Sequence, residues 1–171
     1  SSKRNVISGN DYNGVYINGD DSLLTVVLKN NYIGTDYLGV TAIGNSIPDE
    51  SPAVDIDADN STIITVGGVA ENEGNLISGN SSDSGLCVRN GIVTVLGNII
   101  GLDITGLIAL PNAEGIGLRA GEGDPGDEVV ATIGNGTAEG RNIISGNLSA
   151  GITIEDNVTA TIQGNYIGTT I

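Results

Sequence analysis

Residues 74–80 read Gly-Asn-Leu-Ile-Ser-Gly-Asn, and residues 97–103 read Gly-Asn-Ile-Ile-Gly-Leu-Asp. Both follow one pattern of consecutive residues. It begins with Asn, continues with an apolar residue or Tyr and then with Ile, and ends with Gly or Ser-Gly. The pattern occurs six times, with first residues Asn5, Asn31, Asn75, Asn98, Asn142 and Asn165. From Asn31 onward every second copy returns after 67 residues. A fixed period of this kind predicts a solenoid, in which each repeat buries its apolar edge only against its neighbours.

A second element recurs between these copies, in which a small residue precedes two apolar residues separated by one variable position. It occupies residues 14–17, 53–56, 85–88, 115–118 and 151–154. Apolar residues that alternate at a period of two indicate a strand with one buried face. Several asparagines are preceded by a third alternating segment, at residues 26–28, 93–95 and 160–162. The shortest repeat therefore contains three short strands, and the longer ones add inserted loops.

The predicted fold class is all-β: one parallel β-solenoid domain over residues 1–171, with about five coils of three short strands. Stacking places like residues about 4.8 Å apart, so the aliphatic residues form continuous inward rows. The six leading asparagines then form a column at a bend, where Asn tolerates left-handed backbone geometry. Stacked amides in such a column hydrogen-bond to one another as an asparagine ladder. We interpret this ladder as structural.

The composition supports a narrow core and excludes two classes of partner. The chain has no Phe, Trp, Met or His, and a core of similar stacked layers needs no large aromatic residues. The formal net charge is −15, whereas nucleic-acid binding and docking on an anionic membrane both need a basic surface. The most apolar window, residues 92–110, contains Asn98 and Asp103. We therefore expect no nucleic-acid partner and no membrane insertion.

The outward positions of the predicted strands place opposite charges beside each other. Stacking puts Asp57 beside Arg89 and Arg119 beside Glu155, which predicts two ion pairs between neighbouring coils. Exposed pairs contribute less than about 1 kcal/mol each, so we expect them to specify register rather than stability.

The chain has a single cysteine, Cys87, which excludes an intramolecular disulfide. The strand pattern predicts that its side chain points outward between Asp55 and Gly117. An exposed thiol at this position would be able to join two chains, whereas a thiol covered by a loop would be inert.

Two acidic segments are candidates for a cation site. The first carries Asp55, Asp57 and Asp59, in a spacing that resembles the start of a calcium loop. It lacks the glycine and the bidentate glutamate that such a loop requires. The second segment is a glycine-rich turn that carries Glu122, Asp124, Asp127 and Glu128. Clustered carboxylates favour Ca²⁺, but a solvated acidic surface is the simpler interpretation, and we expect no cofactor.

The sequence also contains five Asn-x-Ser/Thr triplets, which are candidate N-glycosylation sites. Their asparagines are Asn60, Asn80, Asn135, Asn147 and Asn157. We expect all five at turns or strand ends outside the ladder column. Glycosylation then depends on a host that secretes the chain.

At the level of whole motifs, the chain resembles a known repeat family. One set resembles the "NxISGN" repeat, at residues 4–10, 74–80 and 141–147. The other set resembles its partner, "GNYIGTD", at residues 30–36, 97–103 and 164–170, with Asn30, Ile99, Leu102 and Thr170 as departures. These motifs are similar to right-handed parallel β-helix repeats of large prokaryotic surface proteins, related to the pectate-lyase-like superfamily. The resemblance covers the whole chain and implies an extracellular or cell-surface location, but no catalytic residue.

We therefore expect a structural or adhesive protein of the cell surface. Because the chain begins and ends within repeats, we expect a segment of a longer array or a unit that stacks end to end as a homopolymer. Open sheet edges are templates for pairing with another chain. Other surface components or polysaccharide are the further partners that this hypothesis allows.

The alternative function is that of a carbohydrate-active enzyme or carbohydrate-binding module on the same fold. Polysaccharide hydrolysis requires two carboxylates in different environments, and Asp55 and Asp57 are the candidates. A lyase requires a basic proton acceptor, and the chain has no His, so we expect no enzymatic activity. Binding of ice or mineral by a flat face would require a regular Thr-x-Thr array. The threonines at positions 25, 94, 159 and 161 are too irregular in sequence to predict one.

Overall fold

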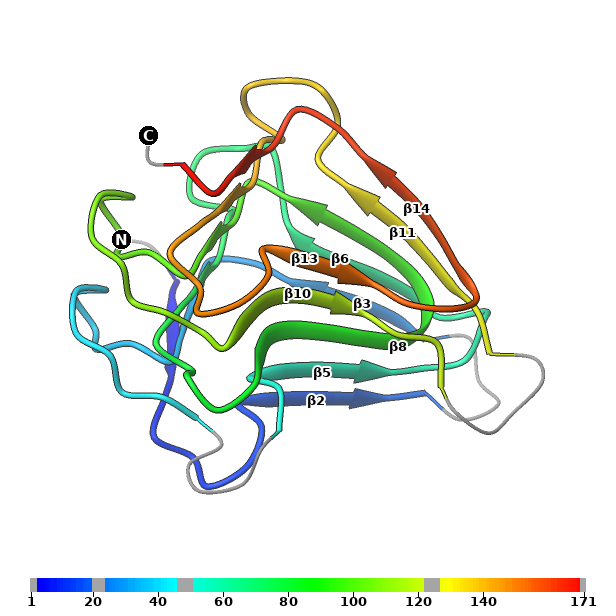
Figure 1. The fold of residues 1–171 in the computed structure, drawn as a ribbon, viewed down its shortest axis with the longest axis horizontal. Helices are drawn as coiled ribbons and strands as arrows, with labels where there is room; N and C mark the ends of the chain where they lie inside the picture. The colour runs from blue at the N-terminus through cyan, green and yellow to red at the C-terminus, as the bar shows by residue number, and fades with distance from the viewer. Residues whose placement is uncertain (1–2, 20–23, 46–50, 122–126, 170–171) are drawn as a thin grey trace.

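The computed structural model describes residues 3–19, 24–45, 51–121 and 127–169. These residues form fifteen β-strands, and no helix occurs among them. Every pair of neighbouring strands is parallel, which confirms the prediction of an all-β fold with parallel sheets (Figure 1). Sheet A contains, in spatial order, β1 (Asn5–Ile7), β4 (Asn31–Ile33), β7 (Leu76–Ile77), β9 (Ile99–Ile100), β12 (Ile143–Ile144) and β15 (Tyr166–Ile167).

The remaining strands form two further parallel groups that share one long strand. Sheet B contains β2 (Val15–Asn18), β5 (Val54–Asp57), β8 (Ser84–Leu96), β10 (Glu114–Leu118) and β13 (Ile152–Ile154). Sheet C contains β3 (Thr25–Leu28), β6 (Ile63–Gly67), β8, β11 (Val129–Ile133) and β14 (Val158–Ile162). Strand β8 pairs through its first half in sheet B and through its second half in sheet C, and Figure 1 shows it turning the corner between them. The turn uses Gly91, whose φ of 104° suits glycine.

The core lies between the three sheets and consists of aliphatic rows in register. In sheet B, Val54, Leu86 and Ile116 stand one above another and are fully buried. Sheet A contributes a row of four fully buried isoleucines, namely Ile33, Ile77, Ile100 and Ile144. In the last layer, inward side chains are open to solvent. Ile154, which pairs with the buried Leu118, is 48% exposed, and Ile167, which pairs with Ile144, is 47% exposed. The last layer therefore buries its side chains less completely than the inner layers do.

The six leading asparagines form a hydrogen-bonded column beside sheet A. Each side-chain amide donates to the carboxamide oxygen of the next asparagine, over 2.7 Å from Asn5 to Asn31 and 2.9 Å at each later step. The same oxygens also accept hydrogen bonds from backbone N–H groups. Asn98 Oδ1, for example, accepts one from Asn75 N over 2.9 Å. The second N–H of Asn98 donates to Val66 O. These bonds satisfy the buried carboxamides, as buried polar groups require.

A second asparagine column runs parallel to the first, and sequence analysis missed it. Its members, Asn10, Asn45, Asn80, Asn112 and Asn147, are joined by side-chain hydrogen bonds of 2.7 to 3.1 Å. Three of them end the Ser-Gly-Asn motif, whereas Asn45 and Asn112 follow inserted loops. The motif therefore carried a signal for this column, but the insertions hid its regular spacing.

The two inserted loops repeat one structure. Antiparallel bridges join Thr35 to Ala42 in the first loop and Leu102 to Ala109 in the second. In each loop, the side chain of an aspartate accepts hydrogen bonds from two backbone N–H groups of the same loop. Asp103 Oδ1, for example, accepts them over 3.0 and 3.1 Å. The loops also contact each other through a backbone hydrogen bond of 2.9 Å. Across the described ranges, the structure contains no helix long and apolar enough to cross a bilayer.

Candidate functional site

The outer face of sheet B carries three of the four ion pairs found among the described residues. The cluster that they form centres on Asp55, Arg89, Glu114, Arg119 and Cys87. The strand register places Cys87 between Asp55 and Gly117, as predicted from the alternation. The side chains that gather around this row come from neighbouring turns, so they lie together only because the strands are parallel and in register.

One predicted ion pair is wrong and is replaced by another. A β-bulge between Ile56 and Asp57 shifts the register, so that Asp57 lies opposite Asn90 and not Arg89. Arg89 Nε instead donates to Asp55 Oδ1 at 3.0 Å. The bulge is a local insertion of one residue, which the repeat pattern of the sequence does not show.

The predicted pair between Arg119 and Glu155 is present, and Arg119 makes further contacts. Its Nε lies 2.9 Å from Glu155 Oε1, and its Nη2 lies 2.5 Å from Glu114 Oε2. Its Nη1 donates to Ser84 Oγ at 3.3 Å and approaches Cys87 Sγ at 3.8 Å. Burial by itself lowers the pKa of Arg119, but the hydrogen bond to Glu155 and the charge of Glu114 outweigh it and raise the pKa.

Glycine at position 117 makes room for this guanidinium. A Cβ atom there would lie 2.6 Å from Arg119 Nη1, closer than side-chain atoms approach. The strand alternation points this position outward, so a larger residue would have displaced the arginine from Glu114. A glycine at an outward strand position, two residues before an arginine, was the sequence signal for the cluster.

Burial also shifts the pKa values of two groups at this face. It raises the pKa of Asp55, although the neighbouring Arg89 charge opposes the shift. It raises the pKa of the Cys87 thiol, whose side chain is fully buried. The thiol is therefore protonated at neutral pH and a poor nucleophile. The charged hydrogen bonds of the cluster connect the neighbouring strands β5, β8, β10 and β13, so these side chains stabilise the sheet.

The candidate cation ligands that lie within the described residues do not gather in the structure. No group of three or more His, Cys, Asp or Glu side chains within residues 3–19, 24–45, 51–121 and 127–169 is placed to hold a metal ion. Asp59 Oδ1 accepts hydrogen bonds from Ser61 and Thr62, and Asp127 Oδ1 accepts one from Asn90. Glu128 Oε1 lies 3.5 Å from the Thr159 hydroxyl. Glu122 and Asp124 lie outside the described residues.

The structure separates the five glycosylation candidates into two groups. Asn60, Asn135 and Asn157 are exposed at turns. Asn80 and Asn147 lie shortly after strands β7 and β12, outside the column of leading asparagines, but both belong to the second asparagine column. Asn80 is 1% exposed, and its Nδ2 donates to Ile33 O, Ser78 O and Asn112 Oδ1. The nitrogen of Asn80 to which a glycan would be attached is therefore buried and hydrogen-bonded in the folded chain.

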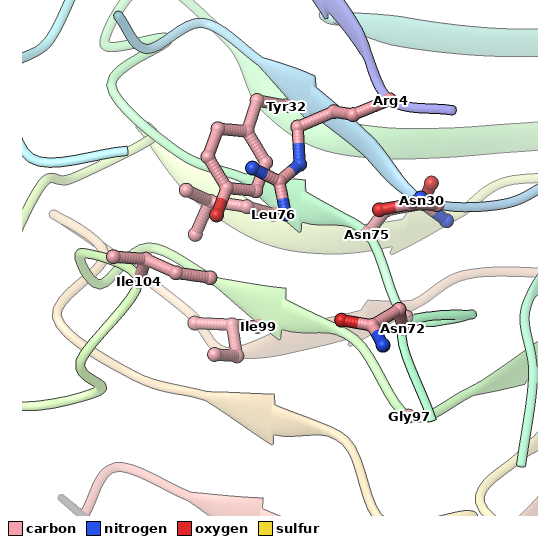
Figure 2. A pocket seen from close by; sticks show the side chains of 10 residues that line it. Arg4, Asn30, Tyr32, Asn72, Asn75, Leu76, Gly97, Ile99 and Ile104 are labelled. Carbon is pink, nitrogen blue, oxygen red and sulfur yellow. The ribbon is translucent and has the colours of Figure 1, made fainter. Parts of the chain in front are cut away.

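A separate hollow of about 200 Å³ lies on the outer side of sheet A. Figure 2 shows the Arg4 guanidinium against the face of the Tyr32 ring, 3.8 Å from its centroid. The apolar side chains around the hollow are Leu76, Ile99 and Ile104, and the polar ones include Asn30 and Asn72. Sequence analysis did not identify this group, because its members come from four turns and two loops.

The hollow has a recognisable structural cause. Gly39, with φ of 72°, brings its loop against the sheet, and a Cβ there would lie 2.8 Å from Tyr32 and 2.9 Å from Leu76. At the position that Arg4 occupies in its own turn, two later turns have Gly74 and Gly97. The missing side chains leave the space open.

Comparison of the chain with protein-family models, with curated proteins and with solved structures gives no match. The parallel sheets and the repeated sequence are therefore the basis on which a class is assigned.

Proposed function

We propose that the chain is part of a right-handed parallel β-helix of the "NxISGN" and "GNYIGTD" type, and that it serves as a structural rod at the cell surface. The observation that supports the proposal is the continuous register: two asparagine columns and three parallel sheets run through successive turns. Successive turns contribute the same core rows, so length grows by adding turns without changing the core.

The ends of the stack are the contact surfaces of such a rod. β13, β14 and β15 each have a paired neighbour on one side only among the described strands. The apolar side chains of this layer, such as Ile154 and Ile167, remain about half exposed. A further turn would cover them and accept the free backbone groups, whether it comes from the same chain or from a second copy.

The test is end-to-end association of the purified chain, followed by sedimentation at rising concentration and by electron microscopy. We expect rods that lengthen along the stacking axis. Ile154→Lys puts a charge on the end face and should weaken association, whereas Val130→Lys, on the lateral face of sheet C, serves as the matched control. Association unaffected by Ile154→Lys, or abolished equally by Val130→Lys, would show that the end face is not the contact.

A second candidate function rests on the outer face of sheet C. The strand register aligns four threonines in one uninterrupted column, namely Thr65, Thr94, Thr132 and Thr161. The adjacent column contains Thr25, Ile63, Ile92, Val130 and Thr159, none of which is charged. The array is more regular than the sequence predicted, and its fixed repeat suits a crystalline surface such as ice. Thermal hysteresis that is lost in Thr94→Lys, but kept in a Thr105→Lys control, would support this function, and no hysteresis in the unmodified chain would refute it.

A further inference from the structure

We propose that a notch at the end of the stack, formed by Gly146, Asn147 and Gly151, binds an extended peptide segment of another chain with the sequence aliphatic–X–Asn. The notch encloses about 90 Å³, and Ile144 and Ile167 are among its walls. It lies at the end of the second asparagine column, next to Asn147. This binding rests on the proposed function in one respect, because it too uses the end face of the stack as a contact surface.

Two earlier turns show what a site of this kind holds. In the first, Gly9 N donates to Ile43 O over 3.1 Å. Asn10 donates to Asn45 Oδ1 from its backbone N over 3.3 Å and from its side-chain Nδ2 over 2.7 Å. Residues 43–45, which read Ile-Gly-Asn, are therefore held by the Ser-Gly-Asn motif of the neighbouring turn.

The second occupied site repeats these hydrogen bonds with a different segment. Gly79 N donates to Leu110 O over 2.9 Å. Asn80 donates to Asn112 Oδ1 from its backbone N over 3.1 Å and from its Nδ2 over 3.0 Å. The segment held here, residues 110–112, reads Leu-Pro-Asn. The two occupants thus share an aliphatic residue and an asparagine, whereas the residue between them differs.

The third Ser-Gly-Asn motif, residues 145–147, presents the same donors at the notch. Neither Gly146 N nor Asn147 N donates a hydrogen bond to any residue that the structure describes. Asn147 Nδ2 makes one long hydrogen bond, of 3.4 Å, to Ile100 O. The two segments that fill the other sites are held in their own turns, so the segment for this site comes from a second polypeptide chain.

The notch is suited to both halves of a carboxamide. In the second occupied site, Asn112 Nδ2 donates to Ile77 O over 3.0 Å, and the same oxygen accepts a backbone N–H. The equivalent oxygen at the notch, Ile144 O, accepts the backbone bond from Gly168 N over 3.0 Å and has a second lone pair for a side-chain donor. An asparagine matches the donors and this acceptor together, whereas aspartate lacks the donor and leucine lacks both groups.

Glycine provides the room for the carboxamide. A Cβ atom on Gly85 would lie 2.7 Å from Asn112 Nδ2, and one on Gly14 would lie 2.9 Å from Asn45 Nδ2. Gly151 has the equivalent position in the turn of the notch, at the start of the same recurring strand element. The notch therefore offers an asparagine side chain the same space as the two occupied sites do.

The test is titration of the ¹⁵N-labelled full chain with a blocked peptide of residues 108–114, Ile-Ala-Leu-Pro-Asn-Ala-Glu, at a concentration at which the chain sediments as a monomer. We expect saturable shifts of the Gly146, Asn147 and Gly151 amide signals, with a dissociation constant of about 1 mM for a segment held by so few hydrogen bonds. Peptides with Asn112→Leu and Asn112→Asp should each bind at least about tenfold more weakly, because each loses hydrogen bonds of the carboxamide.

Two matched glycine variants of the chain locate the site. Gly168→Asn adds a side chain to the wall of the notch, at a φ of 73° that asparagine tolerates and where a Cβ meets no atom within 4 Å. It should weaken binding of the parent peptide at least about fivefold. Gly136→Asn makes the same change at a φ of 78° on an exposed loop, where the nearest atom would be 3.9 Å away, and should leave binding within about twofold.

Three results would overturn the assignment of the notch: no shifts with the parent peptide, equal affinity for the Asn112→Leu peptide, or binding that Gly168→Asn leaves unchanged. The outcome is separable from that of the proposed rod. A chain that binds the peptide but forms no rods would support the notch and refute the rod, whereas a chain that forms rods but does not bind the peptide would refute the notch alone.

Discussion

The asparagine columns predict a large stability difference between identical substitutions at two heights of the stack. The substitution Asn98→Ala removes a carboxamide whose oxygen accepts hydrogen bonds from Asn75 N and Asn75 Nδ2, each over 2.9 Å. The Nδ2 group of the same side chain donates hydrogen bonds to Val66 O, Leu96 O and Asn142 Oδ1. All of these bonds lie at a side chain that is fully buried.

The magnitude follows from the partners left behind. A buried polar group that loses its partner costs about 1–3 kcal/mol. Asn75 N has no other bond in the column, whereas Asn75 Nδ2 keeps its bond to Leu28 O. With two or three groups left partly unsatisfied, the free energy of unfolding should fall by about 3–5 kcal/mol. Asn5→Ala removes one bond at an exposed end and should cost less than about 1 kcal/mol.

Urea unfolding followed by circular dichroism measures both variants. At a slope of about 2 kcal/mol per M, Asn98→Ala should lower the midpoint by about 1.5–2.5 M. Asn98→Asp preserves the volume but replaces the donor by an oxygen, so it should be at least as unstable as the alanine variant at neutral pH. If Asn98→Ala and Asn5→Ala unfold within about 1 kcal/mol of each other, or if Asn98→Asp is as stable as the unmodified chain, the hydrogen bonds do not carry the stability.

Three further outcomes are expected. Cys87 should react with a thiol reagent at least about 100-fold more slowly in the native chain than in urea, because burial raises its pKa; equal rates would contradict its burial. Leu118→Ala should cost about 2–5 kcal/mol through a core cavity, whereas Leu107→Ala, at a side chain that is 61% exposed, should change stability by less than about 0.5 kcal/mol; thermal unfolding compares the two. Backbone hydrogen bonds within each loop hold the pKa of Asp36 low, and for Asp103 such bonds outweigh a burial effect that would raise it. Their contribution to loop stability is therefore complete above about pH 4 and is lost as pH falls through the lowered pKa of the folded state. The protection of the loop amides against hydrogen exchange, relative to the intrinsic exchange rate at each pH, should therefore fall below about pH 4 and stay constant above it.

Period and alternation in the sequence were sufficient to predict an all-β fold with parallel sheets. The spacing of the asparagines placed Ile33, Ile77, Ile100 and Ile144 in one buried row, and the alternation placed Cys87 between Asp55 and Gly117. These features were predictable because a stacked layer must bury the same positions in every turn, so the pattern that identifies the strands also determines their alignment.

Only the tertiary structure decided the features that depart from the repeat. The bulge after Ile56 exchanged Asp57 for Asp55 as the partner of Arg89, and inserted loops of unequal length concealed the second asparagine column. The hollow beside Arg4 arises from side chains that are absent at Gly74 and Gly97. A periodic sequence determines what repeats because every layer satisfies the same packing requirement. Single-residue shifts, loop positions and vacant space depend on contacts between turns far apart in the chain, and these form only when the layers are stacked.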